Sequence, residues 1–515
     1  MSDQQEDQQN RPKVKSALAG GFRDYLPSEM IPRQRMIATI REVFETFGFD
    51  PLDTPGMERR ATLTGGDPKF SMRIFDAKVS GERIVVDPAD PDGDRTALRF
   101  DLTVPLARVV AKYMGAENGP SIRKPFKRYQ VGMVWRGEKP QAGRLREFMQ
   151  FDADIVGTAT LVADAEIIAL MVATMRALGV ERYQVRFNNR KLLNGLPAYA
   201  GFDAAMAADV LRVIDKLPKI GREAVLRELT KPVKPDEPER AKAVVAEEGA
   251  ENEEAAFGLG LPTAVADRVG AFLDLTGTTD ELLDRASSLF AGVAIAEEGI
   301  GELRQIVAAL RAMRVDEQCW QFDLSIARGL AYYTGPVFET FLVSADGKIL
   351  TLPHTDEGTG EQIVEQFGSV FSGGRYDDLV TRFLEASIPA TGASVGVDRL
   401  FDYLTRLGKI TLEPTRTQVL VTVMDQVAMP DYLAMAGELR SAGLRTILWI
   451  GEETAFKAQL AYATAQEIPV VIIAGDRERA AGTVTVKNMR ARTQVVVERS
   501  DLVGAVQAAL DITRA

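Results

Sequence analysis

The 515-residue sequence predicts an α+β protein: a mainly antiparallel sheet flanked by helices, interrupted by a helical insertion and followed by an α/β domain. Strand-like segments lie on both sides of an Ala/Leu/Glu-rich stretch of helical period, residues 190–319. From Thr417 onward strands and helices alternate regularly, which is typical of an α/β sheet. Polar residues also recur on strands that are otherwise apolar. These observations predict two sheet-containing domains, the first of which carries a polar site.

Shifts in composition set the expected boundaries. Pro414 lies in a short linker, residues 408–416, between the two sheet-containing domains. The expected parts are a flexible tail (1–18), a sheet domain in two pieces (19–189 and 320–410), a helical insertion (190–319) and an α/β domain (417–515).

The first half opens with a helix from Pro32 to Phe47, because apolar residues from Met36 to Phe47 follow the helical period and Gly48 supplies a stop. A proline-bearing edge strand should follow at 50–55. The remaining elements expected before the insertion are strands at 84–87 and 97–100, a helix at 104–113, two polar strands, a helix at 163–178 and a strand at 183–188.

After the insertion, strand-like sequence returns, and a glycine-rich strand feeds a helix within 390–404. The other strands expected here lie at 321–325, 337–342, 350–352 and 368–372. In the last domain we expect a largely parallel sheet. Its elements are strands at 419–423, 446–449 and 470–474, two further strands, and helices at 429–442, 454–466 and 501–512.

Composition excludes several kinds of chemistry. Cys319 is the only cysteine, which excludes intrachain disulfides and multi-thiolate zinc sites and favours a reducing cytoplasm. His354 is the only histidine, which argues against a histidine triad or a histidine-ligated metal. No apolar run is long enough to cross a bilayer, and the polar N-terminus does not resemble a secretory signal. Arg, Asp, Glu, Gln, Tyr and bound ions are therefore left to carry any chemistry, while the net charge of −11 argues against indiscriminate nucleic-acid binding.

The most informative segment is 135–154, where a strand, a loop and a second strand carry several charges. Alternation places Gln150, Asp152 and Asp154 on one face, with Phe151 and Ile155 on the other. For this segment alone, a solvent-exposed polar face and a site for a charged ligand have equal weight.

Four more segments of the same kind favour a ligand site over a solvent-exposed polar face. In 98–105, Thr103 is expected to cap a helix with Pro105 in its first turn, which leaves the charge of Asp101 unexplained. Segments 327–335 and 371–377 combine glycines with Arg and Tyr, which fits either ordinary turns or close approach to a ligand. Segment 392–400 is a glycine-rich strand that opens a helix, a common turn that can also hold phosphate.

Together and in this order, these segments resemble the class II aminoacyl-tRNA synthetases, specifically the histidyl-tRNA synthetase family. The stretch ending at Pro55 is similar to the first motif of the class, which builds a dimer interface. Segments 136–154 and 392–400 are similar to the second and third motifs. Arg-Gly-Leu-Ala-Tyr-Tyr-Thr-Gly (328–335) and Ser-Gly-Gly-Arg-Tyr-Asp (372–377) resemble the two signatures of the histidine enzymes. The resemblance runs from Gly20 to the C-terminus, with the insertion matched by position only, and Ala331 stands where the family usually has Asp.

The resemblance implies ATP-dependent ligation of L-histidine to tRNA(His) through a histidyl-adenylate. It assigns catalysis to Arg136, which contacts the substrate carboxylate and the α-phosphate of ATP, and to Arg328, which adds positive charge in the transition state. Arg399 would hold the γ-phosphate, and Glu138 would contact ATP or its Mg²⁺. The resemblance implies no metal fixed by His or Cys, because Mg²⁺ arrives with ATP.

For the amino acid, the resemblance assigns Asp101, Thr103 and Gln150 to the α-ammonium group. Asp154, Tyr332 and Tyr333 would surround the imidazole. The histidine site implied by the resemblance also includes Leu102, Arg136 and Arg328, and its glycine-rich walls include Gly373, Gly374, Tyr376 and Gly396.

The resemblance further implies a cytoplasmic homodimer that uses L-histidine, ATP and tRNA(His), with no membrane and no DNA partner. The last domain resembles an anticodon-binding domain, where Lys487, Arg490 and Arg492 fit RNA backbone and an exposed hairpin equally well. Two rivals remain: a histidine-sensing regulatory subunit of ATP phosphoribosyltransferase, and a sibling synthetase for glycine, proline or threonine. The sequence leaves open the role of the insertion and any need for an extra 5′ guanosine on the tRNA.

Overall fold

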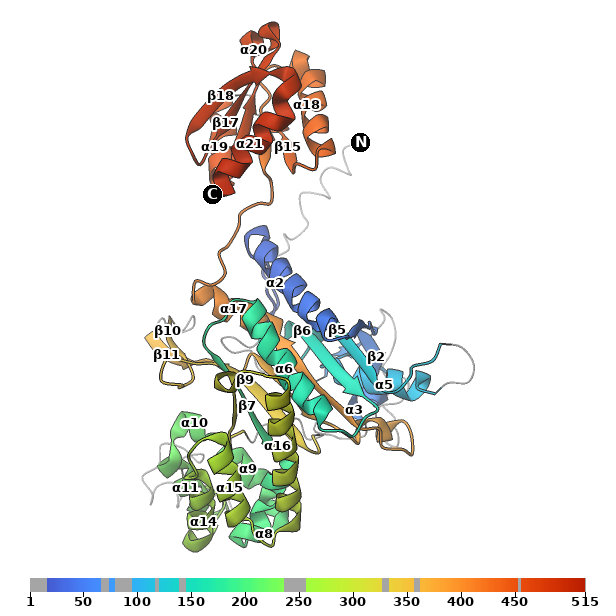
Figure 1. The fold of residues 1–515 in the computed structure, drawn as a ribbon, viewed down its shortest axis with the longest axis vertical. Helices are drawn as coiled ribbons and strands as arrows, with labels where there is room; N and C mark the ends of the chain where they lie inside the picture. The colour runs from blue at the N-terminus through green and yellow to red at the C-terminus, as the bar shows by residue number, and fades with distance from the viewer. Residues whose placement is uncertain are drawn as a thin grey trace, which may run out of the picture. The chain divides into compact units, whose positions relative to one another are not determined.

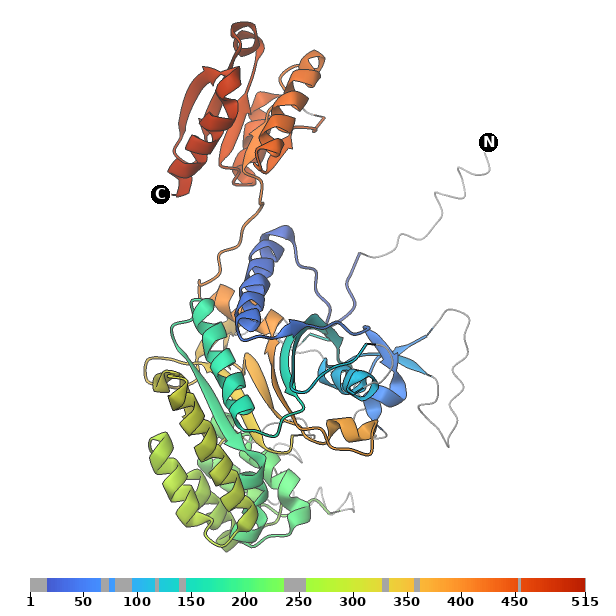
Figure 2. The ribbon, with the colours of Figure 1, turned by 45° about the vertical axis from the view of Figure 1, so that its right-hand side comes forward.

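The computed structural model describes residues 16–65, 74–78, 95–115, 120–138, 145–235, 256–326, 333–355, 362–452 and 455–514. The chain divides into two units (Figures 1 and 2). Unit 1 comprises Met1–Arg23 and Ile37–Lys409, and unit 2 comprises Asp24–Met36 and Ile410–Ala515. The strand expected at 84–87 lies outside the described residues, as do Arg328, Ala331 and Tyr332.

Unit 1 is built on an eight-stranded sheet of order β1-β5-β6-β13-β12-β9-β7-β8. The outermost pairs, β1–β5 and β7–β8, are parallel, and all pairs between them are antiparallel. The strands are β1 (Asp50–Pro51), β5 (Phe126–Trp135), β6 (Glu147–Val156), β7 (Tyr183–Asn189), β8 (Trp320–Phe322), β9 (Pro336–Leu342), β12 (Phe371–Arg375) and β13 (Ala390–Gly396). The expected proline-bearing strand at 50–55 is therefore shorter than predicted.

Smaller elements surround this sheet. A three-stranded sheet has the order β2-β4-β3, and β10 pairs with β11. These strands are β2 (Met57–Arg59), β3 (Asp76–Ala77), β4 (Thr96–Leu98), β10 (Thr351–Thr355) and β11 (Gln362–Gln366). The helices outside the insertion are α2 (Pro27–Thr46), α3 (Arg60–Thr64), α5 (Thr103–Tyr113), α6 (Val162–Ala177), η3 (Leu379–Arg382) and α17 (Val397–Arg406).

One face of the eight-stranded sheet is apolar. Phe44 of α2 packs against Phe151 of β6 and Phe371 of β12, with ring centroids 4.8 and 6.3 Å apart. Helix α6, buried along most of its length, lies against the same face (Figure 1). Because strand side chains alternate, this packing leaves the polar residues of β5, β6 and β13 on the opposite face.

The described part of 190–319 is helical, as the sequence predicts, and its helices gather at one end of unit 1 (Figure 2). The elements are α7 (Arg190–Asn194), α8 (Leu196–Ala200), η1 (Ala204–Met206), α9 (Ala207–Ile214), α10 (Leu217–Ile220), α11 (Arg222–Thr230), α14 (Thr263–Leu273), α15 (Thr279–Leu289), α16 (Ala294–Ala312) and η2 (Glu317–Cys319). Phe272 and Phe290 meet edge to face in its core, 5.8 Å apart.

Unit 2 contains a five-stranded sheet of order β15-β14-β16-β17-β18. Helices α18 and α21 cover one face, and α19 covers the other. The elements are β14 (Val419–Val421), η4 (Gln426–Ala428), α18 (Met429–Ser441), β15 (Thr446–Leu448), α19 (Phe456–Ala465), β16 (Val470–Ile473), α20 (Asp476–Ala481), β17 (Thr483–Asn488), β18 (Thr493–Glu498), η5 (Arg499–Asp501) and α21 (Leu502–Arg514).

The expectation of a largely parallel sheet in unit 2 holds only for β15, β14 and β16. Strands β17 and β18 add antiparallel pairs. The connection from Asn488 to Thr493 is too short for the crossover that a parallel neighbour requires, so these two strands form a hairpin.

Helix α2 begins at Pro27, five residues before the start expected from the sequence. Pro32 is tolerated inside it although proline lacks the N–H that would bond to the carbonyl of Ser28. That carbonyl accepts a hydrogen bond from the backbone N–H of Glu413 instead, at 3.1 Å. Among the described residues, no helix is long and apolar enough to cross a membrane.

Candidate active site

Three neighbouring strands place their polar residues in three rows on one face of the eight-stranded sheet. Strand pairing fixes the rows, each read across β5, β6 and β13. They are Arg128–Asp154–Gly392, Gln130–Asp152–Ser394 and Gly132–Gln150–Gly396. The side chains of Gln150, Asp152 and Asp154 are buried, with 8%, 2% and 2% of their surface exposed. The predicted shared face is therefore confirmed, and the solvent-exposed alternative is excluded for these three residues.

The segment that leads into α5 covers this face. Arg99 lies over Gly132, where a Cβ would stand 2.3 Å from its Nη2 atom. Arg99 donates from Nη1 to the carbonyl of Thr54 (2.6 Å), and Arg128 donates from Nη2 to the carbonyl of Leu102 (3.1 Å). These bonds hold the start of α5 above strands β5 and β6.

Asp101, rather than Thr103, caps helix α5. Its Oδ1 accepts the backbone N–H of Val104 at 3.0 Å, whereas Thr103 is already the first helical residue. The expected cap at Thr103 is therefore wrong, although Pro105 does lie in the first turn. An aspartate one position before the N-cap residue satisfies an orphan N–H of the first turn in the same way as a capping side chain. This accounts for one oxygen of Asp101.

Asp154 is held from two sides. Its Oδ2 lies 2.8 Å from Nη2 of Arg128, and its Oδ1 accepts a hydrogen bond from the hydroxyl of Tyr376. A Cβ at Gly392 would stand 2.1 Å from that Oδ1, so only glycine leaves room for the carboxylate. At Gly374 a Cβ would meet the backbone carbonyl oxygen of Pro336 at 2.7 Å and the ring of Tyr333 at 3.0 Å, so this glycine makes room for both. The structure thus brings Asp154, Tyr333 and Tyr376 together.

The other two predicted wall glycines differ. Gly373 belongs to the apolar-face register of β12, and its Cβ would meet the carbonyl oxygen of Gly392 at 2.0 Å. Its missing side chain therefore serves strand packing. Gly396 lies beside Gln150 on the polar face, and the nearest atom to its would-be Cβ is Cβ of Arg399, 3.8 Å away.

The two arginines predicted to contact phosphates lie at one edge of this face. Strands β5 and β13 both pair antiparallel with β6, so their carboxyl ends share an edge. Arg136 follows β5 there, and Arg399 lies in the first turn of α17 after β13. The guanidinium of Arg136 donates from Nε to the carbonyl of Phe100 (3.1 Å) and lies 5.0 Å above the ring of Phe148.

Neighbouring contacts fix this edge. Arg399 donates from Nη1 to the carbonyl of Ser369 at 2.9 Å. Oδ2 of Asp398 accepts the backbone N–H of Met149 at 2.5 Å, which ties the start of α17 to β6. Glu138 is half-buried at the same edge, and its carbonyl accepts a hydrogen bond from Nε of Arg146 (3.1 Å). Arg328 and Tyr332, which the sequence adds to the site, fall outside the described residues.

The site is rich in buried carboxylates. Burial raises the pKa of Asp101 to about 6 and that of Asp152 to about 7, although Arg128 counteracts both shifts. Burial also raises the pKa of Asp154. The pKa of Tyr333 is raised by burial and by these same carboxylates, so this phenol stays neutral. Carboxylates that lack sufficient positive charge around them favour a cationic ligand.

The sequence does not predict Arg128, Gln130 and Ser394 as site residues, nor the part played by Asp152. Asp152 lies within the predicted polar face, but the family resemblance gives it no role. Arg128, Gln130 and Gly132 repeat the same two-residue period on β5, which was an available signal. Their position opposite the β6 residues depends on strand register, which a single sequence does not reveal.

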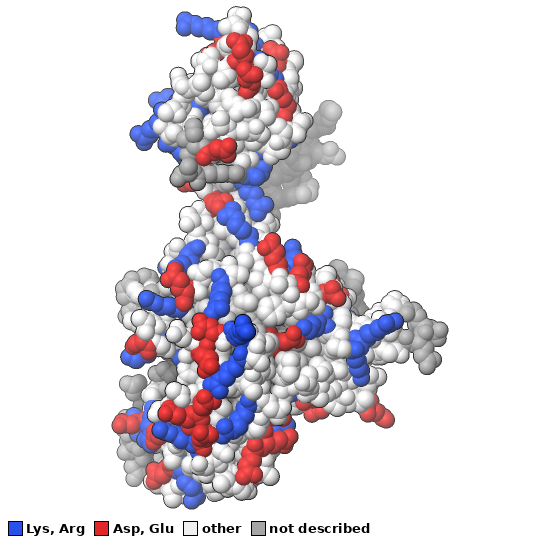
Figure 3. Space-filling view, in the orientation of Figure 1, with Lys and Arg blue, Asp and Glu red and all other residues white. Residues whose placement is uncertain are grey.

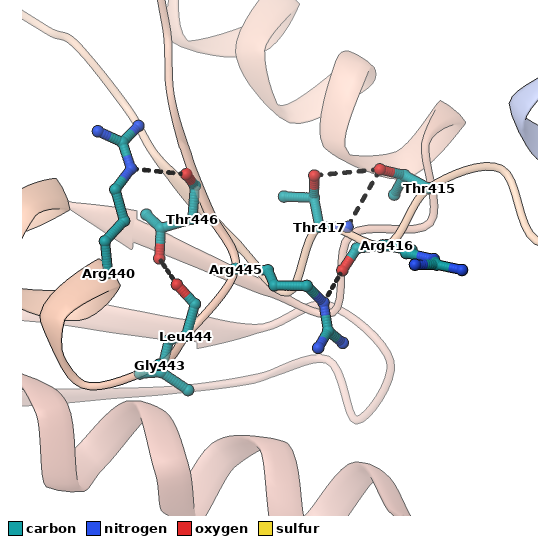
Figure 4. Close-up of a pocket in the computed structure, with 8 residues that line it drawn as sticks. All are labelled: Thr415, Arg416, Thr417, Arg440, Gly443, Leu444, Arg445 and Thr446. Carbon is teal, nitrogen blue, oxygen red and sulfur yellow. Dashed lines mark hydrogen bonds between the residues drawn. The ribbon is translucent and has the colours of Figure 1, made fainter. Parts of the chain in front are cut away.

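Unit 2 carries a basic surface at the amino ends of β14 and β15, which we call the arginine groove (Figure 4). It is an open groove of about 460 Å³, lined by Thr415, Arg416, Thr417, Arg440, Gly443, Leu444, Arg445 and Thr446. Nε of Arg440 donates to the carbonyl of Thr446 (3.1 Å), and Nε of Arg445 donates to the carbonyl of Arg416 (2.6 Å). The three guanidinium groups point in different directions (Figure 4).

The basic residues singled out in the sequence lie elsewhere in unit 2. Lys487 is the last residue but one of β17, while Arg490 and Arg492 lie in the turn before β18. The side chain of Asn488 accepts the backbone N–H groups of Arg490 and Ala491, which orders this turn. In contrast, Figure 3 shows acidic and basic side chains interleaved over the insertion, where ion pairs such as Arg311–Asp280 (2.7 Å) form.

Comparison with known proteins identifies the family. Residues 21–400 match the family model of histidyl-tRNA synthetase, and residues 418–509 match that of an anticodon binding domain. The histidine–tRNA ligase of Paracoccus denitrificans (strain Pd 1222) is 40% identical over 500 residues, which cover 96% of this chain and 94% of the relative. The corresponding ligase of Jannaschia sp. (strain CCS1) is 39% identical over 496 residues, 94% of this chain and 91% of the relative.

A solved structure agrees with these relatives. The histidyl-tRNA synthetase of Nostoc sp. PCC 7120 superposes with a TM-score of 0.72 at 29% identity, covering 96% of this chain and all of that one. The predicted fold class, a class II catalytic fold followed by an anticodon-binding domain, is confirmed. The chain belongs to the histidyl-tRNA synthetase family of class II aminoacyl-tRNA synthetases.

Proposed function

We propose that the polar face of the eight-stranded sheet is the site at which this chain activates L-histidine with ATP and transfers it to tRNA(His). Family membership gives the reaction class, which is the charging of tRNA with histidine during protein synthesis and which uses ATP. The observation that supports this location is the group of buried carboxylates on β6, beside an edge that carries Arg136 and Arg399.

The first step is attack by the histidine carboxylate on the α-phosphorus of ATP, which forms histidyl-adenylate and releases pyrophosphate. Attack by one anion on another requires concentrated positive charge and fixed positions more than it requires a general base. Arg136 contacts the substrate carboxylate and the α-phosphate, and Arg399 holds the γ-phosphate. Guanidinium groups suit both ligands because their paired N–H groups match two oxygens. Arg328 is assigned to the α-phosphate in the transition state.

Mg²⁺ accompanies ATP in this proposal, with Glu138 near the phosphates. The described residues contain no group of three or more His, Cys, Asp or Glu side chains arranged to hold a metal ion. The phosphates of ATP would bring the ion to the site, as is usual for Mg²⁺ bound with a nucleotide.

On the amino-acid side, Asp101, Thr103 and Gln150 bind the α-ammonium group, and Asp154 with Tyr332 and Tyr333 reads the imidazole. The contacts of Asp154 with Arg128 and Tyr376 support this role, because they fix its orientation before histidine arrives. A pocket built to hydrogen-bond a polar ring rejects apolar side chains, which leave its buried donors and acceptors unpaired.

Unit 2 binds the tRNA, and we assign the backbone contact to the arginine groove. Within the described part of the chain, Arg416, Arg440 and Arg445 form no ion pair with a carboxylate, and carbonyl acceptors hold two of their Nε atoms. Guanidinium groups that point outward in different directions suit an extended polyanion better than one small anion (Figure 4). Homodimerisation, a cytoplasmic location and the absence of a DNA substrate complete the proposal.

The rival reading is a histidine-sensing regulatory subunit without ligase activity. The match of residues 418–509 to an anticodon binding domain supports the ligase, because a sensor has no use for that domain. ATP–pyrophosphate exchange should be measured with each of the amino acids in turn, followed by aminoacylation of tRNA. We expect exchange with histidine alone and transfer to tRNA(His). Histidine binding without exchange would support the sensor, and exchange with glycine, proline or threonine would support a sibling enzyme.

A further inference from the structure

Three buried oxygen atoms near the start of α5 and the middle of β6 have neither a hydrogen-bond donor nor an ion-pair partner in the described part of the chain. They are Oδ2 of Asp101, Oε1 of Gln150 and Oδ1 of Asp152. Each residue is more than nine-tenths buried. A fourth oxygen, Oδ2 of Asp154, also lacks a hydrogen bond but lies 2.8 Å from Nη2 of Arg128 in an ion pair. An unpaired buried acceptor costs about 1–3 kcal/mol, so three in one place indicate a ligand that supplies donors.

The hydroxyl of Ser394 links two of these residues. Gln150 donates from Nε2 to Oγ of Ser394 at 2.7 Å, and the same hydroxyl bonds to the carboxylate of Asp152. Gln150 and Asp152 are two residues apart on one face of β6, about 7 Å between their Cα atoms. Ser394 engages Nε2 of Gln150 and the carboxylate of Asp152. Oε1 of Gln150 and Oδ1 of Asp152 therefore remain available to one ligand.

Asp101 completes the group from the opposite side. Its Oδ1 is engaged by the N–H of Val104, which leaves Oδ2 as the open atom. Asp101 and Asp152 are close enough for the charge of one to raise the pKa of the other. A cation placed between them would remove this repulsion.

We propose that Asp152 also binds the α-ammonium group of histidine directly, so that its open oxygen joins those of Asp101 and Gln150 beside the hydroxyl of Thr103. An ammonium group has three N–H donors, which equals the number of open acceptors. In contrast, Asp154 already contacts Arg128 and Tyr376 through its two oxygens. Asp152 is therefore a substrate-binding residue on the amino-group side, and this inference rests on the proposed function.

The test compares histidine with imidazolepropionate, which keeps the ring and the carboxylate but lacks the ammonium group. We expect Asp152→Ala to raise the KM for histidine in pyrophosphate exchange by about ten- to a hundredfold, the range for a lost charge-assisted hydrogen bond. The KM for ATP should change less than about twofold, because the contact is with the amino acid. Inhibition by imidazolepropionate should be unchanged, because this analogue makes no contact with Asp152.

Two further variants make the result interpretable. Asp152→Asn preserves shape and an acceptor oxygen but removes the charge, so it should fold and give a smaller increase in the KM for histidine. Glu166→Gln is the matched control: it removes a carboxylate that pairs with Lys127 at 2.8 Å on the apolar-face side of β5. This control should leave both kinetic constants unchanged.

Each outcome bears on the inference. An unchanged KM for histidine in both Asp152 variants, with exchange intact, would overturn the role of Asp152 and leave the proposed function standing. Equal weakening of histidine and imidazolepropionate would place Asp152 at the ring and also overturn the inference. If the unmodified protein shows no histidine-dependent exchange, the proposed function falls and this inference falls with it.

Discussion

Replacing Asp101 by Asn should stabilise the empty protein at high pH while weakening histidine binding. Burial raises the pKa of this carboxyl group from 3.8 to about 6. The folded protein therefore retains the proton at pH values where the unfolded chain has lost it. Folding stability then falls as the pH rises from about 4 to about 6, and the loss persists above that range. An amide at position 101 cannot ionise, so Asp101→Asn escapes the loss.

The magnitude follows from the two pKa values. A difference from 3.8 to about 6 at about 1.4 kcal/mol per pH unit corresponds to about 3 kcal/mol in the free energy of unfolding. Asparagine also keeps an oxygen for the N–H of Val104, the bond that the carboxylate makes at 3.0 Å. The capping contact is thus preserved, and the comparison isolates the buried charge.

The assay is thermal or denaturant unfolding of both proteins without ligand, at pH 4.5 and at pH 8. We expect Asp101→Asn to be more stable by up to about 3 kcal/mol at pH 8 and by only about 1 kcal/mol at pH 4.5. The same variant should have a higher KM for histidine. A stability difference that is independent of pH, or that favours the unmodified protein at pH 8, would refute the argument that this charge is buried without sufficient compensation.

Three further changes test other parts of the site. Gly392→Ala should destabilise the protein by about 1–3 kcal/mol and raise the KM for histidine, because the new Cβ would stand 2.1 Å from Oδ1 of Asp154. The control is Gly301→Ala, whose new Cβ meets no described atom within 4 Å. Unfolding and exchange measurements should show neither effect for this control. Asp154→Ala should raise the KM for histidine more than that for ATP in exchange assays, and equal effects would remove Asp154 from the imidazole pocket. Reversing the charge of both Arg440 and Arg445 should weaken tRNA binding and flatten its salt dependence in filter-binding assays while tRNA-independent exchange stays normal; unchanged binding would exclude the arginine groove.

The sequence predicts the main elements because hydrophobic period and turn residues are local signals. The alternation around Phe151 correctly places Gln150, Asp152 and Asp154 on one face. It does not reveal that this face is buried, because burial depends on the α5 segment packing across β5. It also does not reveal the antiparallel pairing of β17, which depends on the length of a turn and on neighbours distant in the chain.

The site shows the same limit at the level of single residues. Asp101 looks like an unexplained charge in the sequence, whereas the structure divides it into a capping oxygen and an open one. Asp152 lies between two residues that the family resemblance assigns to histidine, yet no motif gives it a role. Its position opposite Gln130 and Ser394 follows from strand register.

Three buried acceptor atoms, Oδ2 of Asp101, Oε1 of Gln150 and Oδ1 of Asp152, both lower the stability of the empty protein and favour ligands that carry an ammonium group. Within the described part of the chain they are buried polar atoms without donors, and two of them belong to carboxyl groups whose pKa is raised by burial. The free energy lost there is recovered only by a ligand that brings N–H groups and positive charge to the same point. An analogue that fits the ring pocket but lacks an ammonium group leaves that cost in place. Discrimination against such analogues should therefore fall in the variants that stabilise the empty site, and a variant that gains stability at Asp101 or Asp152 without losing discrimination would separate the two effects.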